Sequence, residues 1–184
     1  METGEAVWKY TGSEEQHCHS LSSPAAANGL VYVGCSDAST YALNNETGAY
    51  VFAHNTTNFE HTSPILSPDG KTMYVGEQRG FSDKTYAVDA FNGTELWNFH
   101  GVADGDPTAG LATLADGTVL VFREGQIYAL TPAGEIIWRS RALGDALGGD
   151  SAATSVAVTT DNKVIVATNG ESKKPGKVIA LSMA

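Results

Sequence analysis

A short phrase with a turn glycine recurs four times along the chain. In each copy an aromatic residue follows the glycine by four positions, as in Asn92-Gly93-Thr94-Glu95-Leu96-Trp97. The turn glycines are Gly4, Gly48, Gly93 and Gly134, so the steps between them are 44, 45 and 41 residues. A period in the low forties, filled with short alternating apolar runs, predicts propeller blades of four strands each.

A second turn appears once in each repeat, between two further apolar runs. The four pairs are Asn28-Gly29, Asp69-Gly70, Asp116-Gly117 and Asp161-Asn162. Asn, Asp and Gly tolerate the positive φ angles that two-residue hairpin turns require. We therefore expect each pair to form a tight hairpin turn in phase with the glycine–aromatic phrase.

These signals divide residues 1–184 into a single all-β domain with blades at about 12–54, 55–100, 101–140 and 141–184 plus 1–10. The expected strands are 22–27, 30–34, 40–44 and 49–54 in the first blade, 62–67, 72–77, 85–90 and 95–100 in the second, 110–115, 118–123, 126–131 and 135–140 in the third, and 154–159, 163–168 and 177–183 in the fourth.

The fourth blade is one strand short, and residues 6–10 have the sequence of the missing strand. Three arrangements follow from this. The chain could close on itself as a four-bladed ring, or two chains could complete each other's blades in an eight-bladed ring. It could also be an arc of a longer protein. Closure would remove two edge strands that are otherwise prone to aggregation. A monomer and a homodimer both remain open.

Charge and composition exclude some functions. The formal net charge is −10, and the densest positive point is Lys173-Lys174, so the chain lacks the basic stripe that binds nucleic acid. No apolar run approaches the length of a membrane span, and the first residues do not have the pattern of a signal peptide. For Cys18 and Cys35 we expect two buried thiols in preference to one disulfide.

Residues 87–97, Ala-Val-Asp-Ala-Phe-Asn-Gly-Thr-Glu-Leu-Trp, resemble the tryptophan-docking motif of pyrroloquinoline-quinone-type propellers. The Tyr-Val-Gly of residues 32–34 and 74–76 is also typical of that family. The resemblance implies that Trp8, Trp97 and Trp138 stack between neighbouring blades, with Phe52 as a substitute. It also implies that Asp89 fixes its turn.

The resemblance implies a non-enzymatic propeller outside the cytoplasm that binds a partner protein or peptide. The alternative is a fragment or relative of a quinone-dependent oxidoreductase, with quinone and calcium as cofactors. Such enzymes are about three times longer, and many carry a pair of adjacent cysteines, which this sequence lacks. We therefore expect no cofactor and no catalytic residue. A binder of small ligands or carbohydrates is a second alternative.

Some side chains are candidates for a site. His17 and His19 would share one strand face and could ligate a metal, although a polar connection is the preferred interpretation. Two neighbouring sets of repeat positions before the first strands, one with Asp106 and the other with Glu60, should ring the axis at one end. The loops at the same end contribute Arg79, Phe81 and Arg123. An aromatic between charged residues can anchor a partner, so these five residues form the candidate binding face.

Overall fold

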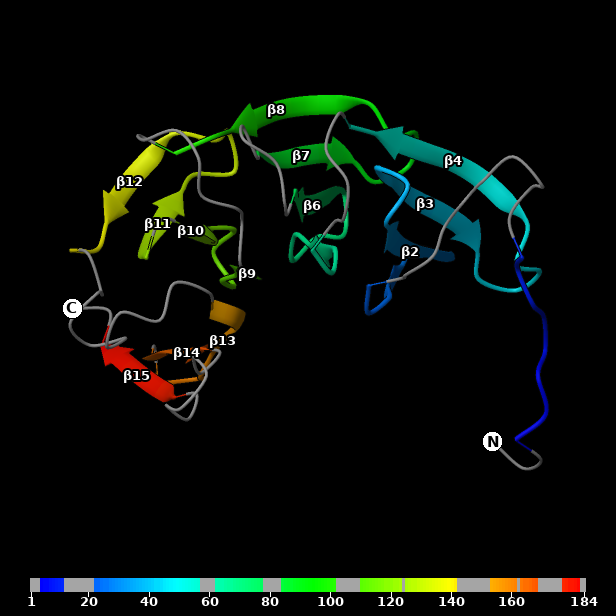
Figure 1. The fold of residues 1–184 in the computed structure, drawn as a ribbon. Helices are drawn as coiled ribbons and strands as arrows, with labels where there is room; N and C mark the ends of the chain where they lie inside the picture. Colours follow the sequence, from blue (N-terminus) through cyan, green and yellow to red (C-terminus); the bar gives the residue numbers. More distant parts are fainter. Residues whose placement is uncertain are drawn as a thin grey trace.

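The computed structural model describes residues 4–11, 22–56, 62–77, 84–101, 110–123, 125–141, 153–161, 163–168 and 177–182. All regular elements in these ranges are β-strands, and they form four antiparallel sheets. The sheets follow one another around an open arc, as successive blades (Figure 1). The all-β propeller architecture expected from the repeat is confirmed.

Each blade is a simple meander in which consecutive strands pair. Blade 1 contains β1 (Ala25–Ala27), β2 (Leu30–Cys35), β3 (Ser39–Asn44) and β4 (Tyr50–Asn55). Blade 2 contains β5 (Ile65–Leu66), β6 (Thr72–Gly76), β7 (Thr85–Asp89) and β8 (Glu95–Phe99). Blade 3 contains β9 (Gly110–Thr113), β10 (Val119–Arg123), β11 (Gln126–Leu130) and β12 (Ile136–Arg139). Blade 4 contains β13 (Ala153–Val158), β14 (Lys163–Thr168) and β15 (Val178–Ser182).

Blade 4 has three strands among the described residues, and β15 forms its edge. The expected fourth strand, near residues 6–10, lies at the other end of the arc (Figure 1). There Trp8 and Tyr10 pack against a buried cluster of blade 1, and the Tyr10 and Tyr41 rings are 6.2 Å apart. In this structure the chain therefore does not close on itself as a four-bladed ring.

The hairpin turns differ between blades more than expected. Asn28 and Gly29 both have positive φ, 52° and 77°, and form the expected two-residue turn. In blade 3 the turn is longer, because the Leu114 amide donates to the Thr118 carbonyl and Gly117 is the left-handed residue. The expectation of the two-residue form at Asp116-Gly117 is therefore wrong. An ordinary turn followed by one left-handed glycine satisfies the same hydrogen bonds.

The core lies between blades. One apolar cluster joins blades 1 and 2 through Tyr32, Met73 and Val88, and another joins blades 2 and 3 through Tyr74 and Val121. A further cluster joins blade 3 to blade 4. Because each sheet buries its apolar faces against its neighbours, the blades depend on one another for stability.

An aromatic ring of one blade covers a turn glycine of the next. A Cβ atom built on Gly48 would lie 2.6 Å from the Trp8 ring, and one on Gly93 would lie 2.5 Å from the Phe52 ring. On Gly134 it would lie 2.8 Å from the Trp97 ring. The indole nitrogens also bond across the junction, Trp8 Nε1 to the Asn45 carbonyl at 2.8 Å and Trp97 Nε1 to the Pro132 carbonyl at 2.9 Å.

Within the turns, Asp89 accepts hydrogen bonds at Oδ1 from the amides of Phe91 and Asn92, at 2.8 and 3.2 Å. Asn44 makes the equivalent bonds to Glu46 and Thr47. A short polar side chain at this position therefore holds the turn in which the covered glycine lies.

A β-bulge precedes each covering aromatic in blades 1 to 3. Leu96 is the extra residue, since Ala87 pairs with Trp97 and Val88 pairs with Glu95. Val51 and Ile137 are the extra residues of the other two blades. A bulge redirects the following side chain and increases the local twist. Here it leaves the extra apolar residue exposed, and in blades 1 and 2 the following aromatic lies against a turn glycine of the next blade.

Gly134→Ala is expected to destabilise the protein more than Gly125→Ala. Both glycines have positive φ, 86° and 65°, which costs an alanine roughly 1 kcal/mol. Only Gly134 lies against an aromatic ring, whereas the space at Gly125 is open. The clash adds roughly 1–3 kcal/mol at Gly134, to be measured by urea unfolding. Equal losses for the two variants would contradict the importance of the ring contact.

Stability should fall as the pH is lowered below about 6.5, the ordinary pKa of histidine. Burial lowers the pKa of His54, which is 6% exposed and packs edge-on against Tyr86 of blade 2. The unfolded chain takes up the proton at higher pH than the folded chain, so acidification favours unfolding. The slope should flatten in His54→Leu and persist in His100→Gln, which changes an exposed histidine. An unchanged slope in His54→Leu would show that this group is not responsible.

Candidate functional site

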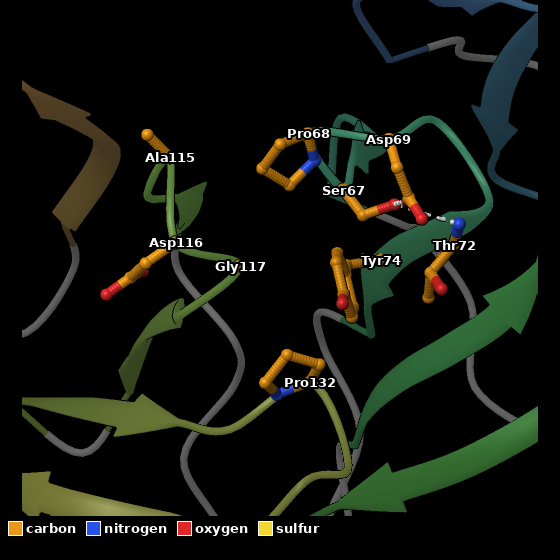
Figure 2. Close-up of a pocket in the computed structure, with 9 residues that line it drawn as sticks. All are labelled: Ser67, Pro68, Asp69, Thr72, Tyr74, Ala115, Asp116, Gly117 and Pro132. Carbon is orange, nitrogen blue, oxygen red and sulfur yellow. Dashed lines mark hydrogen bonds between the residues drawn. The ribbon is translucent and has the colours of Figure 1, made fainter.

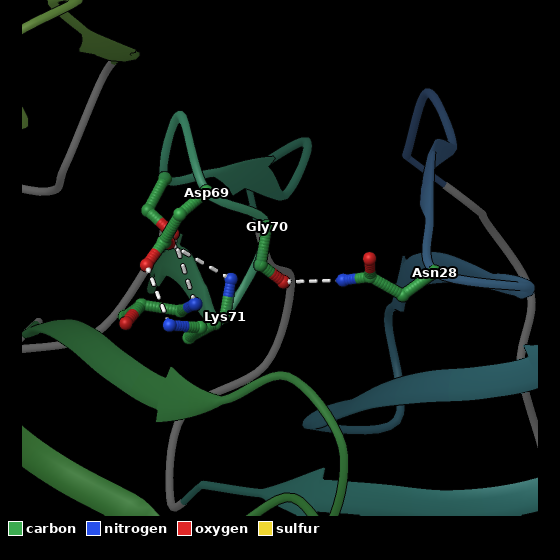
Figure 3. Close-up of polar contacts among 6 residues, drawn as sticks. Asn28, Asp69, Gly70 and Lys71 are labelled. Atoms are coloured by element: carbon green, nitrogen blue, oxygen red, sulfur yellow. Dashed lines mark hydrogen bonds and ion pairs between the residues drawn. The ribbon is translucent and has the colours of Figure 1, made fainter.

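Side-chain hydrogen bonds link blades 1 and 2 at their junction. Asn28 Nδ2 donates to the Gly70 carbonyl at 2.8 Å, from the first turn of blade 1 to that of blade 2 (Figure 3). The buried hydroxyl of Tyr32 donates to the Ala90 carbonyl, also at 2.8 Å. The amide of Asn28 is essential here because it supplies an N–H donor.

At the next junction the residue equivalent to Asn28 is Asp69, and an ionised carboxylate cannot donate. Asp69 Oδ1 instead accepts bonds from its own turn, from Ser67 Oγ at 2.7 Å and from the Lys71 amide at 3.1 Å. The Lys71 ammonium lies 3.6 Å from Asp69 Oδ2 (Figure 3). Asp69 thus faces its own blade, and the amide bridge of the first junction has no counterpart at this residue.

A pocket of about 320 Å³ opens between blades 2 and 3 at this place. Pro68 and Pro132 come from neighbouring blades, with the Tyr74 ring between them (Figure 2). The lining residues are Ser67, Pro68, Asp69, Thr72, Tyr74, Ala115, Asp116, Gly117 and Pro132. The pocket therefore combines two proline rings and a phenol ring with two carboxylates.

The charges of the pocket are fixed by local hydrogen bonds. The Ser67 hydroxyl and the Lys71 amide lower the pKa of Asp69, and bonds from Thr118 lower that of Asp116. Both carboxylates are therefore ionised at neutral pH. Burial is the main cause that raises the pKa of Tyr74, so its phenol is neutral. The arrangement suits an aliphatic or aromatic group that carries a positive charge.

Four of the five residues of the predicted binding face lie outside the described residues, namely Glu60, Arg79, Phe81 and Asp106, and so do the metal-ligand candidates His17 and His19. Arg123 is described, and its placement corrects the prediction. It pairs with Gln126 at the end of β10 and is 1% exposed. The side chain is buried within the blade, so it cannot anchor a partner from a loop.

Arg123 lies at the end of the second strand of its blade. The equivalent position, which is the last residue of that strand or the one after it, is buried in blades 1 to 3. Cys35 is the equivalent residue of blade 1 and Glu77 that of blade 2, 1% and 0% exposed. Glu77 Oε2 accepts a hydrogen bond from the Lys84 amide at 3.0 Å. The position therefore holds a different polar or reactive side chain in each blade.

Cys35 is disulfide-bonded, so the expectation of two free thiols is wrong. The sequence has one other cysteine, Cys18, which lies outside the described residues. A disulfide is typical of proteins that fold in an oxidising compartment.

Metal-binding clusters and membrane-spanning helices are both absent from the described ranges. No group of three or more His, Cys, Asp or Glu side chains there could hold a metal ion. Within the same ranges the fold provides no helix of sufficient length and apolar character to cross a bilayer.

Sequence reasoning missed the pocket residues Asp69, Tyr74, Asp116 and Pro132. It treated the first turn of every blade as equivalent. The signal was the change from Asn28 to Asp69, which removes an N–H donor at one junction while keeping the turn. Whether that donor bridges two blades becomes visible only once the blades are placed side by side.

Comparisons with known proteins agree with the propeller fold. No curated protein matches the chain by sequence. The computationally designed protein Ika4 is a similar solved structure, with a TM-score of 0.68 at 16% identity over 97% of this chain and 99% of that one. The designed protein Ika8 gives 0.68 at 17% over 98% of this chain, and BamB from Moraxella catarrhalis gives 0.62 at 19% over 96%.

The chain spans 50% of the length of Ika8 and 53% of that of BamB. The PQQ-repeat family described as outer membrane protein assembly factor BamB matches residues 1–98 and again residues 82–182. The two matches together cover nearly the whole chain, which therefore belongs to the BamB-like PQQ-repeat family of β-propellers.

Proposed function

We propose that this protein is a non-enzymatic propeller that binds a partner protein or peptide outside the cytoplasm. The observation that carries the proposal is the family match along the chain, to a family described as an assembly factor for outer membrane proteins. The disulfide at Cys35 supports an oxidising, extracytoplasmic location.

The pocket between blades 2 and 3 is the proposed contact surface. Its walls of Pro68, Tyr74 and Pro132 offer apolar area, and Asp69 and Asp116 add negative charge. The whole chain is acidic, with a formal net charge of −10, so a basic partner would also be attracted over longer distances. We therefore propose an extended segment in which Arg or Lys lies beside apolar residues.

We propose no catalytic role for the pocket residues. Asp69 and Asp116 are held ionised by their own turns, and Tyr74 is held neutral. Acid–base catalysis needs groups whose pKa values lie near the working pH. The pKa shifts of Asp69, Asp116 and Tyr74 all run away from neutral pH. Binding of pyrroloquinoline quinone with calcium, together with dye-linked oxidation of a substrate, would instead support the oxidoreductase alternative.

The binding proposal is tested with two fluorescent peptides that differ in charge, one with alternating Arg and Leu and one with alternating Glu and Leu. Polarisation should rise for the Arg–Leu peptide only. Asp69→Asn should weaken that binding at least about fivefold, because it removes a charge and supplies the donor that Asn28 uses to bridge a junction. If the new amide reaches the Gly117 carbonyl, the variant should also gain roughly 1 kcal/mol of stability.

Asp161→Asn is the matched control. It makes the same change in the equivalent turn of blade 4, away from the pocket, where Asp161 pairs with Lys163. Equal loss of binding in both variants would show a general charge effect. Binding of the Glu–Leu peptide as tightly as the Arg–Leu peptide, or full binding by Asp69→Asn, would contradict the pocket as the contact surface.

A further inference from the structure

The two ends of the arc carry the two halves of one more docking junction. Trp138 occupies on β12 the position of Trp97 on β8, at the same bulge and opposite the same alanine position. It is 38% exposed, and its indole N–H donates no hydrogen bond to any described residue. An exposed tryptophan at a position whose equivalents cover a glycine indicates a contact that is completed elsewhere.

Gly4 is the complementary half. Its φ of 66° matches those of the covered glycines Gly48, Gly93 and Gly134, at 70°, 79° and 86°. A Cβ atom on Gly4 would have nothing within 4 Å, whereas the other three would meet an aromatic ring. The turn is thus in the conformation of a docking turn but has no ring above it.

The strands beside these residues are complementary as well. β15 has an open edge, and Val178 on it is 75% exposed. Residues 6–10 have the sequence of a fourth strand but pair with no sheet among the described residues. Val7, at the bulge position before Trp8, is 87% exposed. Such an edge strand invites a further strand.

We propose that two copies of this chain join through two identical junctions into an eight-bladed ring. In each junction residues 6–10 of one copy add the fourth strand to β15 of the other, and Trp138 docks on Gly4 of the partner subunit. By the register of the other blades, Ala180 would pair with Trp8, and Leu181 with Ala6, with Val7 as the bulge residue. A twofold dimer of this kind is closed, completes blade 4 with its fourth strand and leaves no docking turn uncovered.

A second copy suits the site better than the chain's own N-terminus. Residues 4–11 are held on blade 1 by the Trp8–Gly48 contact and the Tyr10–Tyr41 contact, at the end of the arc opposite β15 (Figure 1). Each blade is related to the next by the same contact of an aromatic side chain with a turn glycine. Repeated along this chain, that arrangement leaves a gap between the first blade and the last.

The direct test is light scattering of the purified chain over a range of concentrations. The proposal predicts a particle of twice the chain mass of 19.3 kDa. Trp138→Ala should raise the dissociation constant of the dimer at least about a hundredfold, because a buried tryptophan is lost from both junctions. Trp97→Ala is the matched control, since it removes a junction within the chain and should lower stability more than it lowers dimer affinity.

Gly4→Val is a second variant that keeps the test valid if Trp138→Ala folds poorly. In the isolated chain the new side chain meets open space and adds only the strain of a positive φ, but it would block the seat of Trp138. A monomer at all concentrations, polydisperse aggregates in place of a dimer, or a Gly4→Val dimer as stable as the wild type would each overturn the proposal.

Cross-linking distinguishes the two kinds of closure. Lys9→Cys and Ile179→Cys together place thiols on residues expected to pair, as Tyr86 pairs with Asn98 in blade 2. Oxidation should give a covalent dimer on a non-reducing gel. A cross-linked monomer would mean that each chain closes on itself, and would overturn the two-chain ring.

Discussion

The contact of an aromatic ring with the bare backbone of a glycine is the interaction on which the rest of this structure depends. Trp8, Phe52 and Trp97 each reach from one blade to a turn of the next, at distances that leave no space for a side chain on the glycine. The contact needs two local features, a left-handed turn below and a β-bulge that redirects the ring. Both are encoded within the same short phrase of the repeat.

This contact also explains why each blade of the protein depends on its neighbours. Each blade buries little on its own and gains most of its core from its neighbours, since the apolar clusters bridge adjacent sheets. Stability in such a protein is a sum of blade terms and junction terms. The first and last blades therefore carry incomplete junctions, and the pocket between blades 2 and 3 opens where a junction lacks one bridging donor.

The repeat predicted the blades and the meander because periodic hydrophobic patterns and turn residues act locally, and the family resemblance implied the inter-blade role of Trp8, Phe52 and Trp97. It did not predict the bulge, although the adjacent apolar pair Leu96-Trp97 breaks strict alternation and was a visible sign of it. Arg123 was correctly expected at the end of a strand, but the local pattern does not show that this end of the strand is buried. The state of Cys35 and the pocket at Asp69 depend on residues distant in sequence, which no local pattern specifies.

Native-state amide hydrogen exchange in Trp97→Ala tests the central claim most directly. Trp97 belongs to blade 2 but rests on Gly134 of blade 3, so the variant should lose protection in β11 and β12 as well as in β8. Leu96→Ala, which truncates the exposed bulge residue beside it, should leave blade 3 protected. Loss of protection confined to blade 2 in Trp97→Ala would contradict the account, because it would mean that the ring does not couple one blade to the next.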